Sequence, residues 1–283
     1  MTYLITGATG EVGSRVVRQL LERGIRPRVL VRSEEKARTL FGGRVDVRVG
    51  DLGAPDSMRG AIQGADTVFL VNVGPAIPER DKATAMISKE VGVRKIVKLS
   101  SLDVEYGLAI GAWHEKGEAA IRTTGIPFTF VRPTGFMSNL LAWAHSIGTE
   151  SVVKSSTGDG RRPFIHSEDI ASVCVAALLN DEFSGEALPI TGPESLTFAE
   201  VTAIISEAIG RLLSYQVISD EEARERYSRI SGSQEETEAH VALWRAIREG
   251  RLAATTDRVE RILGRKPITL RRWASENAPS FLN

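Results

Sequence analysis

The sequence predicts an α/β fold, a doubly wound parallel sheet followed by a smaller, mostly helical C-terminal part. Short β-branched runs alternate with longer amphipathic stretches through the first half of the chain, which is typical of βαβ units. A glycine-rich turn directly follows the first of these runs. Beyond Gly192 and Pro193 helical spacing replaces the alternation, so we expect one part over residues 1–192 and another over residues 193–283.

In chain order, the first half is expected to contain strands joined by crossover helices. The strands are predicted at residues 2–6, 27–32, 45–49, 67–72, 95–100 and 128–132. The helices have apolar residues near i, i+3 and i+4, are mostly bounded by Gly or Pro, and are predicted at residues 12–23, 33–40, 55–63, 79–91 and 113–124. Six strands complete a doubly wound sheet.

The second half opens with a predicted helix at residues 170–179. Ser167 before it is a capping residue, and the acidic residues that follow Ser167 favour a helix N-terminus. A further strand is predicted at residues 186–191. The remaining elements are helices at residues 197–209, 220–228, 235–248 and 255–263, with one strand signal at residues 215–218.

Composition excludes several classes of protein. The 283 residues are 42% hydrophobic, and 36 basic residues balance 36 acidic ones, so the chain lacks the field that gathers nucleic acid or an anionic membrane. Cys174 is the only cysteine and the four histidines are scattered, so we expect no disulfide and no metal site. The expected partner is therefore a small molecule.

No basic segment follows Met1, so we expect no targeting signal. No stretch approaches the roughly 20 apolar residues that span a bilayer. We therefore expect a cytoplasmic protein with no membrane association. A homodimer is compatible with the sequence, although no interface can be identified in it.

Gly7, Gly10 and Gly13 follow the first predicted strand and lead into a helix. Glycines at this spacing allow a tight strand-to-helix turn, the approach of backbone to a pyrophosphate and close packing of helix on strand. The helix N-terminus adds free N–H groups and partial positive charge. We therefore expect a dinucleotide-binding, Rossmann-type domain, with a purely structural glycine turn as the alternative.

The Gly-x-x-Gly-x-x-Gly spacing resembles that of the extended and atypical short-chain dehydrogenase/reductases, whose motif commonly reads Thr-Gly-Ala-Thr-Gly, as residues 6–10 do here. At the end of the second strand, where an acidic residue would bind the ribose of NAD, this chain has Arg32 and Ser33. A guanidinium there pairs with a 2′-phosphate, so we expect NADP(H) as cofactor. The alternative is that Arg32 points to solvent and selects nothing.

The ends of the next two strands supply further expected cofactor contacts. The resemblance implies that Asp51 and Leu52 contact the adenine; the alternative for Asp51 is a turn or a helix cap. Asn72, Val73 and Gly74 end the fourth strand beside the expected nicotinamide ribose.

The fifth strand ends at Ser100 and Ser101, where the related reductases place the serine that orients a substrate carbonyl. Their Tyr-x-x-x-Lys pair is absent here. His114 and Glu118 occupy the two positions on the following helix and share one face at i, i+4 spacing. The other register puts Lys116 in the lysine position and leaves an alanine, residue 112, in the tyrosine position.

We therefore expect His114 and Glu118 to be the catalytic residues. His114 would donate a proton or orient the substrate, since the ordinary pKa of histidine, about 6.5, allows either role. Glu118 would bond His114 or the ribose. The alternative is a surface glutamate beside a histidine that packs at the start of the helix.

Several segments together resemble the NmrA-like family, and most closely its members typified by NAD(P)H:quinone oxidoreductase type 2. They are residues 6–10, His114 with Glu118, and residues 124–129, 132–139 and 266–273. The resemblance spans nearly the whole chain. It implies that Arg132, Pro133, Thr134 and Phe136 line the cofactor site and that the substrate is approached by Phe136, Met137, Asn139 and Trp143. By chemistry alone, such an aromatic and methionine cluster is more often core than pocket.

The expected cofactor contacts come from the glycine loop and from the ends of the strands that follow it. They are Gly7, Thr9, Gly10, Glu11, Val12, Gly13, Arg32, Ser33, Asp51, Leu52, Asn72, Val73, Gly74, Ser100, Ser101, Pro133, Thr134 and Phe136.

The first functional hypothesis is an NADPH-dependent oxidoreductase that passes a hydride to a quinone or a related conjugated carbonyl compound. Such an acceptor delocalises the charge left by the hydride and tolerates the missing Tyr/Lys pair, whereas an unactivated ketone needs a positioned acid. The alternative is a non-catalytic, NADP(H)-sensing regulatory protein of the NmrA type. A third hypothesis is an isomerase or epimerase that retains its nicotinamide.

Overall fold

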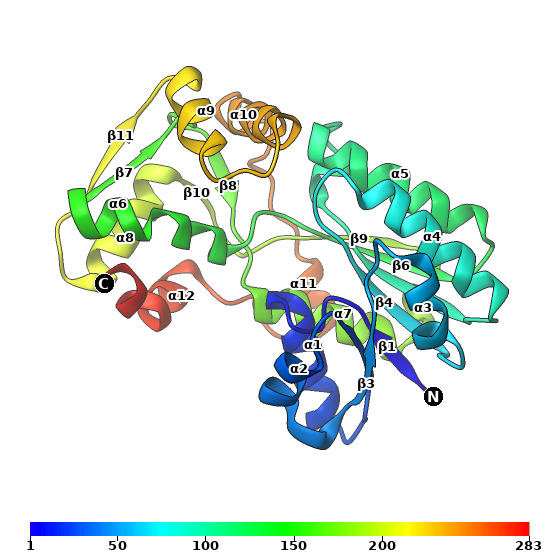
Figure 1. Cartoon of the computed structure of the whole chain (residues 1–283). Helices are drawn as coiled ribbons and strands as arrows, with labels where there is room; N and C mark the ends of the chain where they lie inside the picture. Colours follow the sequence, from blue (N-terminus) through cyan, green and yellow to red (C-terminus); the bar gives the residue numbers. More distant parts are fainter. Residues whose placement is uncertain (283) are drawn as a thin grey trace. The chain divides into compact units, whose positions relative to one another are not determined.

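The first half of the chain forms the parallel sheet that its sequence predicts. The structure is a computed structural model and describes residues 1–282. Its main sheet has seven parallel strands in the order β3-β2-β1-β4-β5-β6-β9 (Figure 1). The strands are β1 (Tyr3–Ile5), β2 (Arg28–Val31), β3 (Asp46–Val49), β4 (Thr67–Val71), β5 (Lys95–Leu99), β6 (Phe128–Pro133) and β9 (Ala187–Ile190).

Helices connect these strands, as the predicted α/β class requires. α1 (Glu11–Glu22) packs against α7 (Ser167–Leu179), and α3 (Pro55–Ile62) packs against α4 (Ile77–Glu90). The others are α2 (Glu34–Phe41) and α5 (Ala109–Thr123). The fold class is confirmed, although α4, α5 and α7 begin two to four residues earlier than expected, because their first turns do not continue the apolar periodicity.

One core of apolar side chains lies between the sheet and the helices α3, α4 and α5. Leu4, Val68 and Ile96 come from three neighbouring strands and are fully buried in it. Met58 of α3 and Ile121 of α5 pack into the same cluster. Burial of the sheet by helices explains why its strands are nearly continuous apolar runs in the sequence.

The strand order reverses at β1 and β4. From β1 the chain proceeds to β2 and β3 on one side, and from β4 to β5 and β6 on the other. Ligands of open α/β sheets bind beyond the carboxyl ends of the strands at such a reversal. The glycine loop follows β1 and Asn72 follows β4, so both lie at the position that the topology favours for a ligand.

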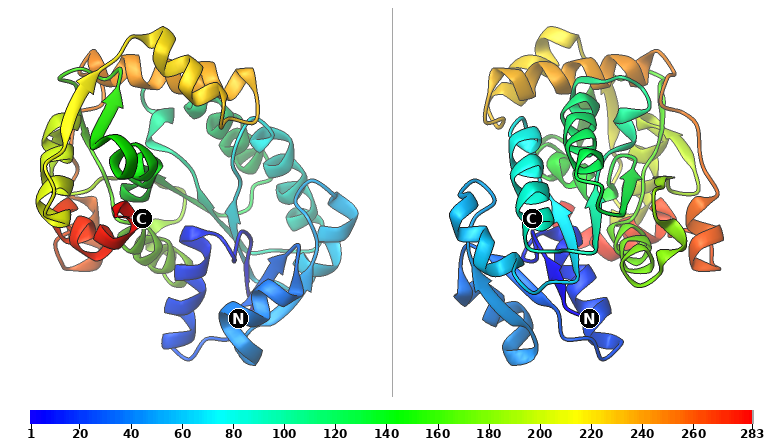
Figure 2. Two further views of the ribbon diagram at one scale, coloured as in Figure 1. Left: turned by 60° about the vertical axis from the view of Figure 1, so that its left-hand side comes forward. Right: turned by 90° about the vertical axis from the view of Figure 1, so that its right-hand side faces the viewer.

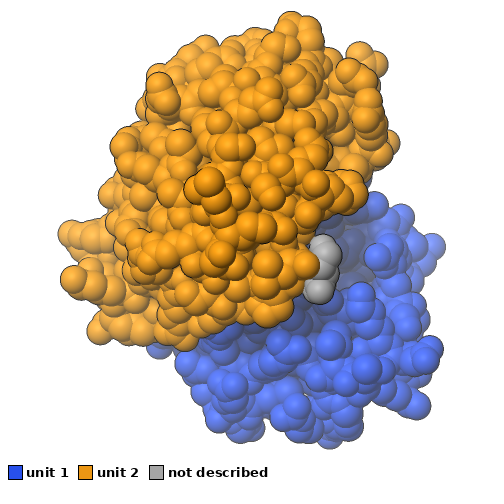
Figure 3. All heavy atoms as spheres, turned by 90° about the vertical axis from the view of Figure 1, so that its left-hand side faces the viewer, with its two compact units in different colours: residues 1–101, 111–132, 167–189 blue, residues 102–110, 133–166, 190–283 orange. Residues whose placement is uncertain are grey.

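The chain divides into two units (Figure 3). The first contains residues 1–101, 111–132 and 167–189, and the second contains residues 102–110, 133–166 and the chain from Ile190 onward. This division differs from the single boundary expected at residue 192. The reason is that Met137, Ile147 and Phe164 pack in one core with Phe198 and Val201, which come much later in the chain.

The second unit contains helices and two small sheets. β7 (Val152–Ser155) pairs in parallel with β11 (Ser214–Val217), and β8 (Arg161–Pro163) pairs antiparallel with β10 (Ser195–Thr197). The helices are α6 (Ala144–Glu150), α8 (Phe198–Ile209), α9 (Asp220–Ser228), α10 (Gln234–Arg248), α11 (Arg258–Leu263) and α12 (Leu270–Asn277). The sequence did not predict α6, α12, β7, β8 and β10, because short elements give weak periodic signals and these strands find their partners far along the chain.

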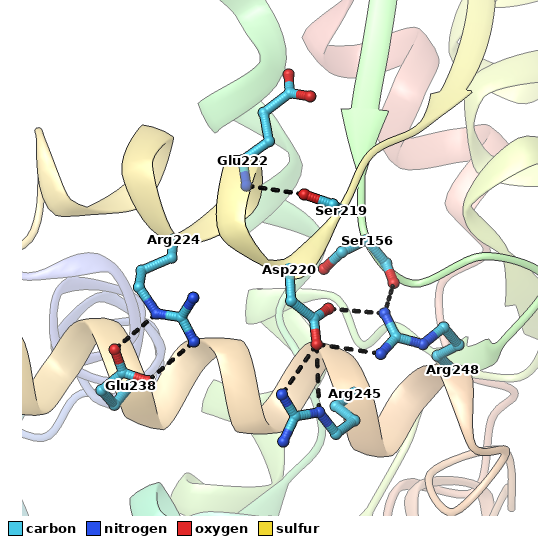
Figure 4. A network of polar contacts seen from close by, with 8 residues as sticks. All are labelled: Ser156, Ser219, Asp220, Glu222, Arg224, Glu238, Arg245 and Arg248. Carbon is cyan, nitrogen blue, oxygen red and sulfur yellow. Dashed lines mark hydrogen bonds and ion pairs between the residues drawn. The ribbon is translucent and has the colours of Figure 1, made fainter.

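Helices α9 and α10 pack against each other and lie side by side in Figure 2, coloured yellow and orange. Asp220, the first residue of α9, accepts hydrogen bonds from Arg248 Nη1 at 2.7 Å and Arg245 Nη2 at 3.0 Å (Figure 4). Arg248 Nη1 also donates to the carbonyl oxygen of Ser156 at 2.6 Å. The two guanidinium groups, Arg248 foremost, lower the pKa of Asp220 from 3.8 to about 2.

Candidate functional site

The glycine loop after β1 depends on the absence of side chains at two of its positions. Gly7 has a φ of +59°, a backbone conformation that other residues rarely adopt. A Cβ at Gly13 would lie 2.1 Å from the carbonyl oxygen of Gly7, so only glycine allows this approach of α1 to the loop. Gly10 N donates to Gly7 O at 2.9 Å and closes the turn.

The N-terminus of α1 faces this loop with no side-chain cap. Its N-cap residue is Gly10, which has no side chain to accept hydrogen bonds from the first turn. The carboxylate of Glu11 accepts a hydrogen bond from Ser167 Oγ at 2.5 Å, so the side chain is directed to the start of α7. Val12 is buried and Thr9 is half-buried. A loop of small residues ahead of an uncapped helix N-terminus fits a bound pyrophosphate.

Arg32 and Ser33 lie at the end of β2 and are both exposed. Ser33 Oγ accepts a hydrogen bond from Lys36 N at 3.3 Å and caps α2. Arg32 forms no ion pair or hydrogen bond with any other residue in the range 1–282, so its guanidinium is available to an anion. This arrangement fits the expected 2′-phosphate and does not by itself distinguish it from a solvent-exposed arginine.

Asp51 forms a local turn at the end of β3. Its Oδ1 accepts a hydrogen bond from Gly53 N at 2.6 Å, and its backbone N–H donates to Ser57 Oγ at 3.0 Å. The alternative interpretation of Asp51 as a turn residue therefore describes its contacts here, and its contact with an adenine stays a prediction. Leu52 is half-buried beside it.

The end of β4 leads into a group of buried charges that the sequence interpretation missed. Asn72 Nδ2 donates to Asp81 Oδ1 at 2.6 Å, and Asp81 Oδ2 lies 2.6 Å from Lys98 Nζ in a fully buried ion pair. Val73 is 76% exposed and Gly74 has a φ of +77°. Lys98 interrupts the apolar run of β5, and a lysine inside a buried strand is the signal that would have indicated a buried acidic partner.

Helix α5 crosses close to this ion pair. A Cβ at Gly117 would lie 2.1 Å from Asp81 Oδ2, so glycine is required at that position. His114, one turn earlier on the helix, is buried. Burial and then the positive charge of Lys98 lower the pKa of His114 well below 6.5, so His114 is neutral at neutral pH. Its Nδ1 is buried without a hydrogen-bond partner among the described residues.

Glu118 is fully buried, and its carboxylate accepts four hydrogen bonds from three residues. Oε1 accepts from Ser100 Oγ at 2.6 Å and from Arg132 Nε at 2.9 Å. Oε2 accepts from Arg132 Nη2 at 2.5 Å and from Arg122 Nη2 at 3.1 Å. No hydrogen bond joins Glu118 to His114 within the described chain. Glu118 is therefore not a surface residue, and it links α5 to the ends of β5 and β6.

The two registers weighed for α5 differ in the surroundings of their side chains. His114 and Glu118 both lie on the buried face of α5, whereas Lys116 is exposed. Ser101, beside Ser100, is half-buried. His114, Glu118 and Ser100 belong to the first unit, in which Ser100 bonds Glu118, and the catalytic roles of His114 and Glu118 stay predictions.

The remaining candidates lie in the second unit or at its border. Pro133 is the last residue of β6, and Thr134 N donates to Ile190 O at 3.0 Å. Met137 is 1% exposed and belongs to the core of the second unit. Trp143 is half-buried and lies 5.5 Å from the ring of Phe198. These two residues have the core contacts that their chemistry suggests.

Two other residues of this segment are less buried. Phe136 is half-buried and pairs with Ile165 through an isolated β-bridge, and Asn139 is exposed. Their contact with cofactor or substrate stays a prediction.

No group of three or more His, Cys, Asp or Glu side chains within residues 1–282 is placed to hold a metal ion. Among the helices of that same range, none has the length and apolar character to span a bilayer.

Comparison with known proteins adds a family and several relatives. A family model described as NAD(P)H-binding matches residues 7–181. The chain is 36% identical to a (4-alkanoyl-5-oxo-2,5-dihydrofuran-3-yl)methyl phosphate reductase of Streptomyces griseus, and the match covers 98% of each protein. It is 32% identical to an NAD(P)H azoreductase of Xenophilus azovorans, again over 98% of each. Its fold matches the NADPH complex of the quinone oxidoreductase QOR2 of Escherichia coli with a TM-score of 0.88 and 21% identity, over 98% of this chain and 99% of that one.

Proposed function

Since the chain belongs to the NAD(P)H-binding family, we propose that it transfers a hydride from NADPH to a quinone or a related conjugated carbonyl compound. The two relatives described above are reductases, and the chain is an NAD(P)H-dependent reductase. The resemblance to NmrA-like proteins and to quinone oxidoreductase type 2, drawn from short motifs, is confirmed. The acceptor and the roles of individual residues are the parts that we propose.

The names of the relatives support an acceptor with a conjugated double bond. One is named for a dihydrofuranone that carries an alkanoyl group and a methyl phosphate, another for azo compounds, and the similar structure for quinones. In each of these compounds the electron pair that a hydride displaces can spread over a conjugated system. The shared property is therefore the ability of the acceptor to hold negative charge by itself.

The observation that carries the proposal is the chemical state of the two candidate catalytic residues. The carboxylate of Glu118 is engaged by Ser100, Arg122 and Arg132, and His114 is neutral. His114 therefore lacks the extra proton of an acidic imidazolium near neutral pH, and the carboxylate of Glu118 is held by its three partner residues. A simple ketone needs such an acid as the hydride arrives, whereas a quinone or a conjugated lactone does not.

The residues of the first unit would hold the cofactor. The first turn of α1 and the loop closed by Gly7 and Gly10 bind the pyrophosphate, and Arg32 pairs with the 2′-phosphate. The amide of Asn72, held by Asp81, offers its oxygen to a ribose hydroxyl. The nicotinamide, when bound, supplies the hydride.

We assign two different roles to the residues on α5. His114 orients the acceptor through a hydrogen bond of its neutral imidazole, which requires no proton to be released in the reaction. Glu118 is a positioning residue, because it fixes Ser100 and Arg132 and makes no contact with His114.

The test is the oxidation of NADPH, followed at the nicotinamide absorbance, with four acceptors: a naphthoquinone, an azo dye, a conjugated lactone and cyclohexanone. We expect turnover with at least one of the conjugated acceptors and none with cyclohexanone. Tight binding of NADPH without turnover on any acceptor would support the NADP(H)-sensing alternative. Efficient reduction of cyclohexanone would contradict the proposed class of acceptor.

A further inference from the structure

Strand β8 carries two consecutive arginines in opposite surroundings. The side chain of Arg161 is 47% exposed and forms two hydrogen bonds of 3.0 Å with Glu200. The side chain of Arg162 is 10% exposed. Alternation of side chains along a strand accounts for the difference. Arg162 is therefore a charged group that the second unit buries.

The guanidinium of Arg162 has few partners for its five N–H donors. Nε lies 3.5 Å from Thr134 Oγ1, and Nη2 lies 3.6 Å from Asp103 Oδ1, which is longer than a hydrogen bond. It makes no other hydrogen bond or ion pair within the described residues. Burial lowers the pKa of Arg162 from its usual value, while Asp103 and Tyr106 oppose that shift, and the group stays charged. The Nη atoms of Arg162 are not sealed from solvent, so a ligand that completes their hydrogen bonds would replace water there.

The backbone beside Arg162 leaves room for the guanidinium. A Cβ at Gly135 would lie 2.9 Å from both Nε and the central carbon of the guanidinium, so any other residue there would displace it. Thr134 and Gly135 follow β6 directly, and Asp103 lies in the short 3-10 helix Leu102–Val104. Two segments of the second unit, far apart in sequence from β8, thus meet at this arginine.

We propose that Arg162 binds an anionic oxygen of the acceptor, beside Thr134 and Gly135. An arginine suits this role because its planar fork donates two parallel hydrogen bonds to oxygen anions. This site would add a substrate contact to the proposed reductase. It depends on the proposed function only in the case where the anion forms during the reaction. Arg162 and Asp103 are not among the site residues expected from the sequence.

Such an oxygen has two chemical sources. One is a permanent substituent of the acceptor, such as a phosphate, sulfonate or carboxylate. The other arises during the reaction: the hydride forms a C–H bond with the acceptor, the π electrons move to the carbonyl oxygen, and NADPH becomes NADP⁺. That oxygen is an enolate or phenolate until it takes a proton from water. Binding and kinetic measurements separate the two sources.

The binding measurement uses calorimetry with naphthalene-2-sulfonate, which is anionic and not reduced, and with the neutral naphthalene-2-methanol. For a permanent anion we expect Arg162→Gln to weaken sulfonate binding about tenfold or more and to leave binding of the neutral alcohol unchanged. Arg161→Gln removes the same charge from the neighbouring residue and is the matched control, for which we expect no change in either.

The kinetic measurement uses a neutral naphthoquinone. If Arg162 stabilises the oxygen that becomes negative during hydride transfer, Arg162→Gln lowers kcat about tenfold or more, while Arg161→Gln retains the original kcat. An effect specific to Arg162 in either measurement supports the proposal and identifies the source of the anion. Equal behaviour of the two variants in both measurements overturns it.

Removal of a buried charge also affects folding, so thermal unfolding of each variant is measured first. If Arg162→Gln does not fold, Arg162→Lys is compared with Arg161→Lys, since lysine keeps the charge but loses the planar fork. We expect about a fivefold or larger loss for Arg162→Lys in one of the two measurements, and values equal to those of Arg161→Lys overturn the proposal. If the original protein reduces no acceptor, the proposed function fails, and the sulfonate measurement still decides whether Arg162 binds anions.

Discussion

Arg32 is the residue on which nucleotide selectivity is expected to depend. Its exposed guanidinium lies at the end of β2 without a partner among the described residues. Replacement by aspartate, Arg32→Asp, substitutes repulsion for a charge-assisted pair, so we expect the ratio of kcat/KM for NADPH to that for NADH to fall about tenfold or more. Steady-state kinetics with both nucleotides measures this ratio.

The control for this prediction is Arg38→Asp, which makes the same change of charge on α2. Arg38 already pairs with Glu34 at 2.8 Å on the exposed side of that helix. We expect this variant to keep the original ratio. A ratio that is unaltered in Arg32→Asp would show that another group selects the nucleotide.

The burial of His114 makes the stability of the protein depend on pH. Its pKa in the folded protein is well below the value of 6.5 expected after unfolding. As pH falls below 6.5, His114 takes up a proton in the unfolded chain but stays unprotonated in the folded protein. The contribution to stability is therefore fully present above pH 6.5 and is lost as the pH falls below it. We expect His114→Gln to show a smaller fall in the unfolding temperature between pH 7.5 and pH 5 than the original protein.

The same variant separates a role in catalysis from one in packing. A hydrogen bond from His114 to the acceptor predicts that His114→Gln lowers kcat more than it changes the KM for NADPH. An unchanged kcat together with the altered pH dependence would leave His114 as a packed, neutral residue only.

At the scale of secondary-structure elements, the carboxylate of Glu118 connects helix α5 to strands β5 and β6. It accepts hydrogen bonds from Ser100 at the end of β5, from Arg132 in β6 and from Arg122 on its own helix. Glu118→Gln removes the buried negative charge that Arg132 and Arg122 bond, so we expect it to lower the free energy of unfolding by about 3 kcal/mol. Urea unfolding measures the change. Glu115→Gln, on the exposed face of α5, should have little effect.

The junction of α9 and α10 depends on Asp220. Its side chain is 12% exposed and bonds Arg245 and Arg248 of α10. We expect Asp220→Asn to lower stability by about 1–2 kcal/mol at neutral pH. Because the pKa of Asp220 is lowered from 3.8 to about 2, this contribution is present above pH 3.8 and disappears as pH falls towards 2. Urea unfolding at pH 7 and pH 3 checks both statements, and Glu221→Gln is the exposed control.

At the scale of the whole molecule, binding of the nucleotide should be visible as stabilisation. A ligand present at a hundred times its dissociation constant adds roughly 2.7 kcal/mol, which corresponds to a rise in unfolding temperature of roughly 5 °C or more. We expect this rise with NADPH in the original protein. Gly10→Val should abolish it, since its side chain would occupy the approach to the pyrophosphate.

The valine variant is measured without nucleotide as well. A Cβ at position 10 would already lie 3.2 Å from the carbonyl oxygen of Gly7, so some loss of stability is expected in the absence of ligand. The informative quantity is the shift that NADPH causes in each protein. Equal shifts in both would contradict the assignment of the glycine loop.

Much of this protein follows from local sequence. The alternation of β-branched runs and amphipathic stretches predicted all seven strands of the main sheet, and the glycines at positions 7, 10 and 13 predicted the loop after β1. Both signals come from the preferences of neighbouring residues: the period of buried side chains and the need for glycine where φ is positive or a Cβ would collide. The family could be inferred from the same short motifs.

Only the tertiary structure determined what surrounds the candidate residues. Glu118 was expected to bond His114 or the ribose, and its protein partners include Ser100 and Arg132; Lys98 pairs with Asp81, and Arg162 lies beside Gly135. Each pair joins residues far apart in the chain, whose meeting depends on strand order and on which helix crosses which strand end. Periodicity indicates that a side chain is buried, but its charge state and its partner follow from the elements that pack against it.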